Sequence, residues 1–397
     1  MTKNEKIQEV LTRGVENIYP NKASLEKVLK SGKKLRLYHG IDPTGLTLHL
    51  GHLVQIIKLK QFQDLGHEVI LLIGDFTAQI GDPTNKFAIR KQLTHKQVIK
   101  NCKDYKKQIG KILDLKKVEF KYNSKWLGKL SFADILGLSA NFTAQQTLAR
   151  DMFKKRIQAG KNLYLHEFLY PIMQAYDSVY MDVDLEIGGS DQMFNMLAGR
   201  TLMKKIKNKE KFVLTTRLLS DSSGNKMGKT EGSIVALNEK PNQMFGKIMS
   251  WSDNLIISGL ELCTNISMEE IKQIEKNIKA NKLNPRDVKA KLAREIVSIY
   301  YGGKEAEEAE KEFEKIFKDK KNPSDIPTIK LLKKKYNILD LLSEIKLALS
   351  KSEAKRLVEQ GGVKVDDKKI DSWKEELEIK NEMIVQVGKR KFVKIKI

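Results

Sequence analysis

The sequence predicts an α/β fold built on a parallel sheet, followed by a helical domain and a small mixed module. Residues 35–41 alternate as a strand does, and residues 53–65 carry apolar side chains at helical spacing. Residues 69–73 are a wholly aliphatic run, which is typical of a buried strand. A strand, a helix and a strand in this order form a βαβ unit with parallel strands. The 397 residues are enough for two or three domains.

Composition excludes several classes of protein. The longest aliphatic run has five residues, too few for a transmembrane helix, and no apolar signal segment follows the polar start of the chain. Cys102 and Cys263 lie far apart, so neither a disulfide framework nor a zinc cluster is supported. We therefore expect a cytoplasmic protein and assign no metal-binding residues.

The net charge of +23 indicates a polyanionic partner such as a nucleic acid. However, only 11 of the 73 basic residues are arginine, and the lysines are spread along the whole chain. This spread is also typical of a compositional bias, so charge alone leaves RNA binding undecided.

Residues 1–34 read as short amphipathic helices that pack outside the sheet. The polar loop that follows the first strand, residues 42–52, is the first candidate site, because open α/β sheets bind ligands at the carboxyl ends of their strands. His49 and His52 flank Gly51 at the predicted helix start, where free backbone N–H groups favour a phosphate and glycine permits close approach. The alternative is an ordinary capped helix start.

The loop after the second strand combines an acid with two bases, Asp82 with Lys86 and Arg90. These charges suit an amino group and a pyrophosphate, although a solvated loop has the same composition. Residues 94–165 alternate helix-like segments with a strand at 118–122. They are interpreted as an insertion between the halves of a nucleotide-binding fold, with room for a dimer contact.

A helix is predicted over residues 165–177, and Tyr170, Gln174 and Asp177 fall on one of its faces at positions i, i+4 and i+7. Their apolar neighbours indicate that this face is buried, so the three polar groups are interpreted as a ligand wall. Residues 182–192 then form a strand that ends in a double glycine and a polar cluster, and a helix follows over 193–206.

Two nucleotide motifs are rejected. Lys229 lies in a sequence like the end of a P-loop, but the first glycine of that motif would be at position 223, which is Ser223. No two glycines are separated by a single residue, so the dinucleotide fingerprint is also missing.

Residues 236–322 are predicted to be helical, with a helix opening at Asn284 and a linker over 318–327 that contains Pro323. Residues 336–397 form a separate module with two helices and strands at 363–365 and 383–397. Its basic residues suit a phosphate-tracking surface, and the candidates for RNA contact are Lys351, Lys355, Arg356 and Lys364.

Taken together, these motifs resemble bacterial tyrosyl-tRNA synthetases of class I over essentially the full length. The carrying motifs are residues 42–44, 49–52, 80–83, 170–177, 189–192 and 226–230, in the family's order and spacing. The resemblance implies a Rossmann-like catalytic domain over 1–235, a helical anticodon-recognition domain, a C-terminal RNA-binding module and a homodimer. Tyrosine, ATP with Mg²⁺, and tRNA(Tyr) would be its substrates.

The resemblance also implies roles for individual residues. Tyr38 and Asp177 would bind the tyrosine hydroxyl, and Asp82, Tyr170 and Gln174 its ammonium group; Asp191 and Gln192 would meet the ribose and the substrate. ATP would contact Asp42, Pro43, Thr44, His49, Gly51 and His52, with Lys86, Arg90, Lys226 and Lys229 around the pyrophosphate. One departure is Met193-Phe194, where many members have Trp-Gly, and this leaves the contacts of Gln192 open.

The chemistry fits these residue types, because a carboxylate that attacks the α-phosphorus of ATP needs positioning and charge neutralisation rather than a general base. Two alternatives remain at this point. Activation of tryptophan is disfavoured by the pair Tyr38 and Asp177. A non-catalytic RNA-binding protein on the same scaffold would be expected to have lost the histidines or lysines.

Overall fold

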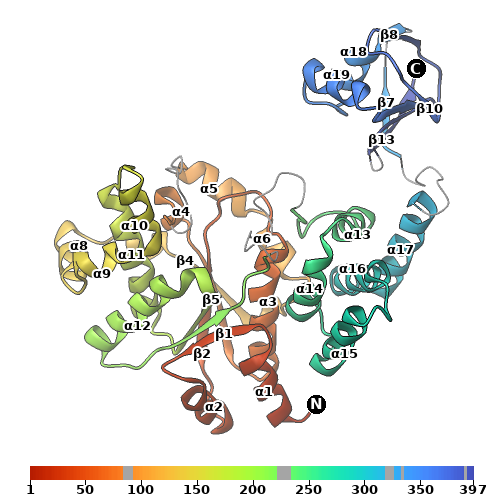
Figure 1. The fold of residues 1–397 in the computed structure, drawn as a ribbon. Helices are drawn as coiled ribbons and strands as arrows, with labels where there is room; N and C mark the ends of the chain where they lie inside the picture. Colours follow the sequence, from red (N-terminus) through yellow and green to blue (C-terminus); the bar gives the residue numbers. More distant parts are fainter. Residues whose placement is uncertain (84–92, 221–233, 318–325, 332–334, 389–390) are drawn as a thin grey trace. The chain divides into compact units, whose positions relative to one another are not determined.

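The structure, a computed structural model, describes residues 1–83, 93–220, 234–317, 326–331, 335–388 and 391–397 (Figure 1). It divides into two compact units, Met1–Glu307 and Glu308–Ile397, and each is described by itself. Five sequence predictions fall outside the described residues: Lys86, Arg90, Lys226, Lys229 and the linker around Pro323.

The first unit is built around a six-stranded sheet in the order β1-β6-β5-β2-β3-β4. All neighbouring strands are parallel except β1 and β6, which are antiparallel. The strands are β1 (Val15–Tyr19), β2 (Arg36–Ile41), β3 (Glu68–Ile73), β4 (Val118–Tyr122), β5 (Leu185–Gly189) and β6 (Phe212–Thr216). The predicted βαβ unit is therefore confirmed.

The chain reverses its direction across the sheet between β2 and β5. From β2 it moves through α3 (Leu50–Asp64) to β3, whereas from β5 it moves through α12 (Met193–Lys207) to β6 on the other side. Because such crossovers are right-handed, α3 and α12 lie on opposite faces of the sheet (Figure 1). The carboxyl ends of β2 and β5 thus form a topological switch point, where α/β sheets bind their ligands.

The prediction for residues 1–34 is wrong in one respect. The two expected helices are present, α1 (Lys3–Thr12) and α2 (Lys22–Lys30), but β1 lies between them and belongs to the sheet. It pairs with β6 about 200 residues later, from Val15 opposite Thr216 to Tyr19 opposite Val213. A half-buried edge strand of five residues has too weak an alternation to be separated from its helical surroundings.

The segment predicted as an insertion contains the edge strand β4, which pairs with β3 in the main sheet. Short helices surround it, and the long α11 follows and packs against α12. These helices are α4 (Thr77–Ile80), α5 (His95–Cys102), α6 (Tyr105–Ile109), α7 (Ser124–Leu127), α8 (Phe132–Ser139), α9 (Ala144–Leu148), α10 (Asp151–Gln158) and α11 (Leu165–Met181), with a 3₁₀ turn over Leu115–Lys117.

The rest of the first unit is helical, as predicted. Asn284 caps the helix that follows it, because its side chain accepts a hydrogen bond from the backbone N–H of Arg286. The helices are α13 (Pro241–Met249), α14 (Ile256–Cys263), α15 (Met268–Lys279) and α16 (Pro285–Tyr301), with a 3₁₀ turn over Asp253–Leu255. The next helix, α17 (Gly303–Phe317), contains the boundary between the two units.

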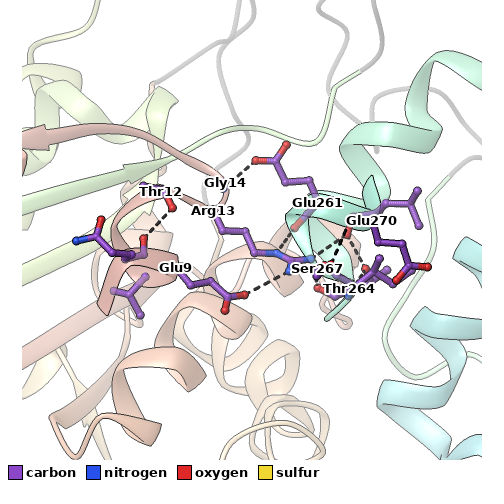
Figure 2. Close-up of polar contacts among 12 residues, drawn as sticks. Glu9, Thr12, Arg13, Gly14, Glu261, Thr264, Ser267 and Glu270 are labelled. Atoms are coloured by element: carbon purple, nitrogen blue, oxygen red, sulfur yellow. Dashed lines mark hydrogen bonds and ion pairs between the residues drawn. The ribbon is translucent and has the colours of Figure 1, made fainter. Parts of the chain in front are cut away.

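Arg13 joins the start of the chain to the end of α14 (Figure 2). Its buried guanidinium donates to four backbone carbonyls around that helix end, at 2.8 Å to Glu261, 2.6 Å to Ile266, 3.1 Å to Leu260 and 2.6 Å to Thr264. The last carbonyls of a helix have no partner within the helix, so Arg13 supplies the missing donors and a favourable charge. Glu261 completes the joint by accepting from the backbone N–H of Gly14 at 3.0 Å.

The second unit is a small mixed module. A five-stranded sheet runs in the order β10-β9-β12-β13-β7, and β11 pairs with β8. Its elements are β7 (Thr328–Lys330), β8 (Lys335–Asn337), α18 (Ile338–Glu344), α19 (Lys351–Glu359), β9 (Val363–Val365), β10 (Lys368–Lys369), β11 (Glu376–Glu378), β12 (Ile384–Val387) and β13 (Lys391–Lys396). The predicted helices and strands are confirmed, and the sheet also includes β7, before the predicted start at residue 336.

Within the described ranges, none of the helices combines the length and the apolar character that a membrane crossing needs.

Candidate active site

A cavity of about 430 Å³, here called the central pocket, opens at the carboxyl ends of β2 and β5. It collects predicted residues from six separate stretches of the chain. Those that line it are Tyr38, Asp42, Thr44, His49, Gly51, His52, Asp82, Tyr170, Gln174, Asp177, Asp191 and Gln192. Pro43 is not among the lining residues, and its carbonyl accepts a hydrogen bond from Asn101 at 2.9 Å.

His49 and His52 cap the start of α3 and also line the central pocket, so the helix-cap interpretation is confirmed and is compatible with the predicted ligand contact. His49 is the N-cap, and its Nδ1 accepts from the backbone N–H of Gly51 at 3.1 Å. The Nδ1 of His52 accepts from the backbone N–H of His49 at 3.2 Å. Burial lowers the pKa of both imidazoles, that of His52 well below its ordinary value. Each ring is thus neutral, with its proton on Nε2 as a hydrogen-bond donor.

The expectation of free backbone N–H groups at this helix start is wrong. Leu50 donates to the carbonyl of Val235 at 3.1 Å, and Gly51 donates to the ring of His49. The N–H of His52 donates to the carbonyl of His49 at 2.8 Å. Gly51 is needed for the ring itself, because a Cβ at this position would lie 2.8 Å from His49. An anion here would therefore meet the imidazole Nε2 atoms rather than the backbone.

Asp177 lines the central pocket and is 2 % exposed. One carboxylate oxygen accepts from the indole N–H of Trp126 at 2.7 Å, and the other accepts from the amide of Asn123 at 3.2 Å. Burial raises the pKa of Asp177, and these two donors oppose the shift. A carboxylate has about four lone-pair positions, so Asp177 can accept a further hydrogen bond from a ligand.

Tyr38 from β2 also lines the pocket, and its hydroxyl lies 3.0 Å from Oγ of Ser178, the residue that follows Asp177. Burial, and then the charges of Glu186 and Asp177, raise the pKa of its phenol, which therefore keeps its proton. Tyr170 is held differently, since its hydroxyl donates to Asp42 at 2.8 Å. The second oxygen of Asp42 accepts from Thr77 at 2.7 Å.

The amide side chains of the pocket are oriented by neighbours. Gln192 donates to Asp82 at 2.7 Å, and its own oxygen accepts from the buried Asn195 at 3.0 Å. Met193 and Phe194 are not among the lining residues. With Met193 and Phe194 in these positions, Gln192 is still oriented within the protein by Asn195 and Asp82.

The sequence interpretation missed a buried ion pair, one member of which, Glu186, lines the central pocket. Glu186 of β5 forms an ion pair with Lys211, which directly precedes β6, and both are buried. Glu186 also accepts from the amide of Gln174 at 3.0 Å. Burial lowers the pKa of Lys211, and Glu186 opposes that shift. A signal was available, because an acid inside a fully buried strand needs a partner.

Asn123 and Trp126 were also missed. Asn123 directly follows β4, so the rule about strand ends applies to it, but the segment was interpreted as an insertion rather than as part of the sheet.

The candidate RNA contacts lie in the second unit, where all four side chains are exposed. Lys351 forms an ion pair with Asp340, and Lys355 lies over the ring of Trp373, 4.5 Å from its centroid.

Comparison with known proteins identifies relatives of both units. The profile of class I tRNA synthetases (W and Y) matches residues 30–318, and that of the tyrosine–tRNA ligase SYY-like C-terminal domain matches residues 312–395. A tyrosine–tRNA ligase of Thermotoga maritima is 43% identical and covers 100% of this chain and 98% of its own length. One from Carboxydothermus hydrogenoformans is 46% identical, with 98% and 97% covered.

Solved structures agree with this comparison. A C-terminally truncated mitochondrial tyrosyl-tRNA synthetase of Coccidioides posadasii is 25% identical, with a TM-score of 0.62 over 78% of this chain and 91% of that one. A tyrosyl-tRNA synthetase of Archaeoglobus fulgidus in complex with L-tyrosine shares the fold, with a TM-score of 0.61, 20% identity and coverage of 78% and 100%.

Proposed function

The chain belongs to the tyrosine–tRNA ligases among the class I tRNA synthetases, and from this premise we propose how its central pocket selects tyrosine and activates it with ATP. The enzyme joins tyrosine to tRNA(Tyr) with ATP as a substrate. In the proposed first step, the tyrosine carboxylate attacks the α-phosphorus of ATP and pyrophosphate leaves. In the second, the tyrosyl group passes to the terminal ribose of the tRNA.

The observation that carries this proposal is that the central pocket is lined by both Tyr38 and Asp177, which lie close enough for the charge of Asp177 to raise the pKa of the Tyr38 phenol. A buried phenol and a buried carboxylate can together satisfy both the oxygen and the proton of one phenolic hydroxyl. Phenylalanine would leave both groups without that partner, which costs free energy. The named relatives are tyrosine–tRNA ligases, so tyrosine is preferred over tryptophan as the substrate.

The substrate ammonium group is assigned to Asp82, Tyr170 and Gln174. Because the Gln174 amide nitrogen already donates to Glu186, its oxygen is left as an acceptor for the ammonium. Tyr170 lines the pocket with an oxygen that can accept while it donates to Asp42. Asp191 and Gln192 would contact the ribose and the tyrosyl group.

The ATP phosphates are assigned to His49 and His52, through their Nε2 protons. Neutral imidazoles can donate to a phosphate without the cost of burying two like charges. From the sequence motifs, Lys86, Arg90, Lys226 and Lys229 would neutralise the pyrophosphate; they lie outside the described residues. Asp42, Thr44 and Gly51 complete the nucleotide side of the pocket.

Mg²⁺ is proposed as part of the substrate, bound to the ATP phosphates. No group of three or more His, Cys, Asp or Glu residues among those described has the arrangement of a metal site. Mg²⁺ commonly reaches such enzymes through substrate phosphates with few protein ligands, so this donor set is compatible with MgATP.

We further propose a homodimer, because the helices α8 to α11 carry exposed large apolar side chains. These are Phe132 and Leu136 on α8, Leu148 on α9, Ile157 on α10, and Leu165 and Tyr180 on α11. Exposed apolar side chains on neighbouring helices are compatible with a protein interface. We also propose that residues 236–322 recognise the anticodon and that residues 336–397 bind RNA. The proposed location of the enzyme is the cytoplasm.

Tyrosine-dependent exchange between ATP and pyrophosphate tests the function. The full-length enzyme should catalyse exchange with tyrosine and far less with phenylalanine or tryptophan. Tyr38→Phe should lower the ratio of kcat/KM for tyrosine over phenylalanine about tenfold, and Asp177→Asn should lower it further because it removes a charged acceptor. An unchanged ratio in both variants would show that other residues recognise the tyrosine hydroxyl.

A further inference from the structure

A chain of buried polar atoms connects the ion pair of Glu186 and Lys211 to Tyr38. The ammonium of Lys211 donates to Ser178 Oγ at 2.8 Å, and Ser178 Oγ lies 3.0 Å from the hydroxyl of Tyr38. Lys211 and Ser178 are both 0 % exposed. Neither lines the central pocket, so any effect on a ligand must pass through Tyr38 or Glu186.

The distances and the charge of Lys211 favour one direction for the protons. Lys211, paired with the Glu186 carboxylate, is an ammonium and can only donate, so Ser178 Oγ accepts from it. The single proton of Ser178 then has two neighbours, the Tyr38 oxygen at 3.0 Å and Glu186 Oε2 at 3.4 Å. Since O–H···O bonds have lengths near about 2.7–2.8 Å, the contact with Tyr38 is the better hydrogen bond.

We propose that Lys211 and Ser178 are positioning residues for substrate selection: Lys211 donates to Ser178, Ser178 donates to Tyr38, and Tyr38 therefore donates its own proton to the phenolic oxygen of tyrosine. The phenolic proton is then given to Asp177. This inference rests on the proposed contact between Tyr38 and the tyrosine hydroxyl.

The direction of this chain matters for discrimination. If Tyr38 donated inward to Ser178, Tyr38 and Asp177 would both be acceptors facing a hydroxyl that has one proton. One of them would remain unsatisfied in the complex, and tyrosine would lose part of its advantage over phenylalanine. With the outward direction, every donor has an acceptor when tyrosine is bound, and two groups lose their partner when phenylalanine is bound.

Glu186 links the two ends of the substrate site. It pairs with Lys211 and also accepts from the amide nitrogen of Gln174 at 3.0 Å. The same carboxylate therefore holds the donor that orients Tyr38 and turns the Gln174 oxygen toward the proposed ammonium position. The opposite charges of the pair make their burial tolerable.

Ser178→Ala in the full-length enzyme is the direct test, because it removes one oxygen atom outside the pocket. We expect the ratio of kcat/KM for tyrosine over phenylalanine in pyrophosphate exchange to fall about threefold to tenfold. The same change in a Tyr38→Phe background should have no further effect on the ratio, since Ser178 acts through the Tyr38 hydroxyl. Thr215→Val is the matched control, because it removes a buried hydroxyl of β6 that contacts only the Asn17 backbone.

The outcomes distinguish a failure of the proposed contact between Tyr38 and the tyrosine hydroxyl from a failure of the positioning role of Ser178. If Tyr38→Phe leaves the ratio unchanged, the proposed contact with the hydroxyl is wrong. If Tyr38→Phe lowers the ratio but Ser178→Ala does not, or if the two effects multiply in the double variant, the positioning role is overturned. An equal fall in Thr215→Val would also overturn it.

A second variant tests Lys211 without leaving a buried charge unpaired. Lys211→Met combined with Glu186→Gln removes both charges and keeps the side-chain shapes. The tyrosine-over-phenylalanine ratio should fall as in Ser178→Ala, because no ammonium then orders the Ser178 proton. A folded double variant that retains the parent's ratio would contradict the role of Lys211.

Discussion

His52 combines a structural role in the helix start with a proposed contact to the ATP phosphates. Its Nδ1 closes the first turn of α3 by accepting from the His49 backbone. That same hydrogen bond fixes the tautomer, so the Nε2 proton is available to the central pocket. Sequence reasoning could identify the residue type and its position at a strand end, but it treated the helix cap and the ligand contact as alternatives.

The partners of the predicted site residues were harder to foresee than the residues themselves. Gln174 and Asp177 follow from helical periodicity, which is a local property of the sequence, whereas Tyr38 was named through the family resemblance. Their hydrogen-bond partners come from elsewhere: Trp126 lies 51 residues from Asp177, and Lys211 lies 33 residues from Ser178. Such pairings depend on the packing of distant elements, which no local pattern encodes.

Gly199 of α12 leaves the space that the buried chain of polar atoms occupies. A Cβ at this position would lie 2.5 Å from Lys211 Nζ and 2.8 Å from Ser178 Oγ. Both atoms are held by partners and cannot move freely. We expect Gly199→Ala to lower the free energy of unfolding by about 1–3 kcal/mol and to raise the KM for tyrosine, measured by urea unfolding and pyrophosphate exchange.

Gly246 of α13 provides the control, because a Cβ there would meet nothing within 4 Å. Gly246→Ala should stabilise its helix by about 0.5–1 kcal/mol and leave the KM unchanged. If Gly199→Ala matches Gly246→Ala in both the free energy of unfolding and the KM for tyrosine, the space around Lys211 and Ser178 is not restricted.

At the scale of elements, α3 is seated on the start of the chain by Lys58. Lys58 is 3 % exposed, and its ammonium donates to the carbonyls of Val10 and Arg13, each at 2.9 Å. Burial lowers the pKa of Lys58 to about 7, Glu9 opposes the shift and Arg13 adds to it. The contact between α1, β1 and α3 should therefore depend on pH.

The sign follows from proton binding. Between pH 7 and the ordinary lysine pKa of 10.5, the unfolded chain binds a proton at Lys58 that the folded chain does not. The free energy of unfolding therefore rises with pH across this window. From pH 7 to pH 9 the parent enzyme should gain about 2 kcal/mol relative to Lys58→Met in urea unfolding.

Lys60→Met serves as the matched control on the same helix, because Lys60 is at the surface and pairs with Asp64. It should follow the parent's pH dependence. Identical slopes for the parent and Lys58→Met would show that Lys58 keeps its proton in the folded state.

Elements with a strong local period were predicted well, and edge elements were not. The helices α11 and α16 and the strand β3 have clear periodicity or clear caps, and all three were located to within a few residues. β1 was missed and β4 was assigned to an insertion, because an edge strand has only one neighbour and a weaker pattern. Their place in the sheet is decided by pairing with β6 and β3.

At the scale of the whole molecule, the separation into two units predicts that activation and tRNA charging can be uncoupled. The central pocket is lined entirely from Met1–Glu307, whereas the proposed RNA contacts lie in Glu308–Ile397. Deleting residues 326–397 should preserve pyrophosphate exchange within about twofold and should reduce tRNA charging strongly at low and moderate salt. The loss relative to the intact enzyme should shrink as salt is raised, because salt weakens the phosphate contacts of the module. A truncated enzyme that charges tRNA normally at moderate salt would exclude the module as an RNA anchor.

The hydrogen bonds of Arg13 to the end of α14 cannot form until late in the synthesis of the chain. The guanidinium leaves the ribosome early, yet its carbonyl acceptors at Glu261 and Ile266 lie 248 and 253 residues later in the sequence. The nascent first unit therefore carries this cation without its native acceptors until nearly all of that unit has been synthesised. A fragment that stops after residue 235 retains every residue that lines the central pocket but remains in that incomplete state, so a cut placed at the end of the catalytic motifs would divide one compact unit.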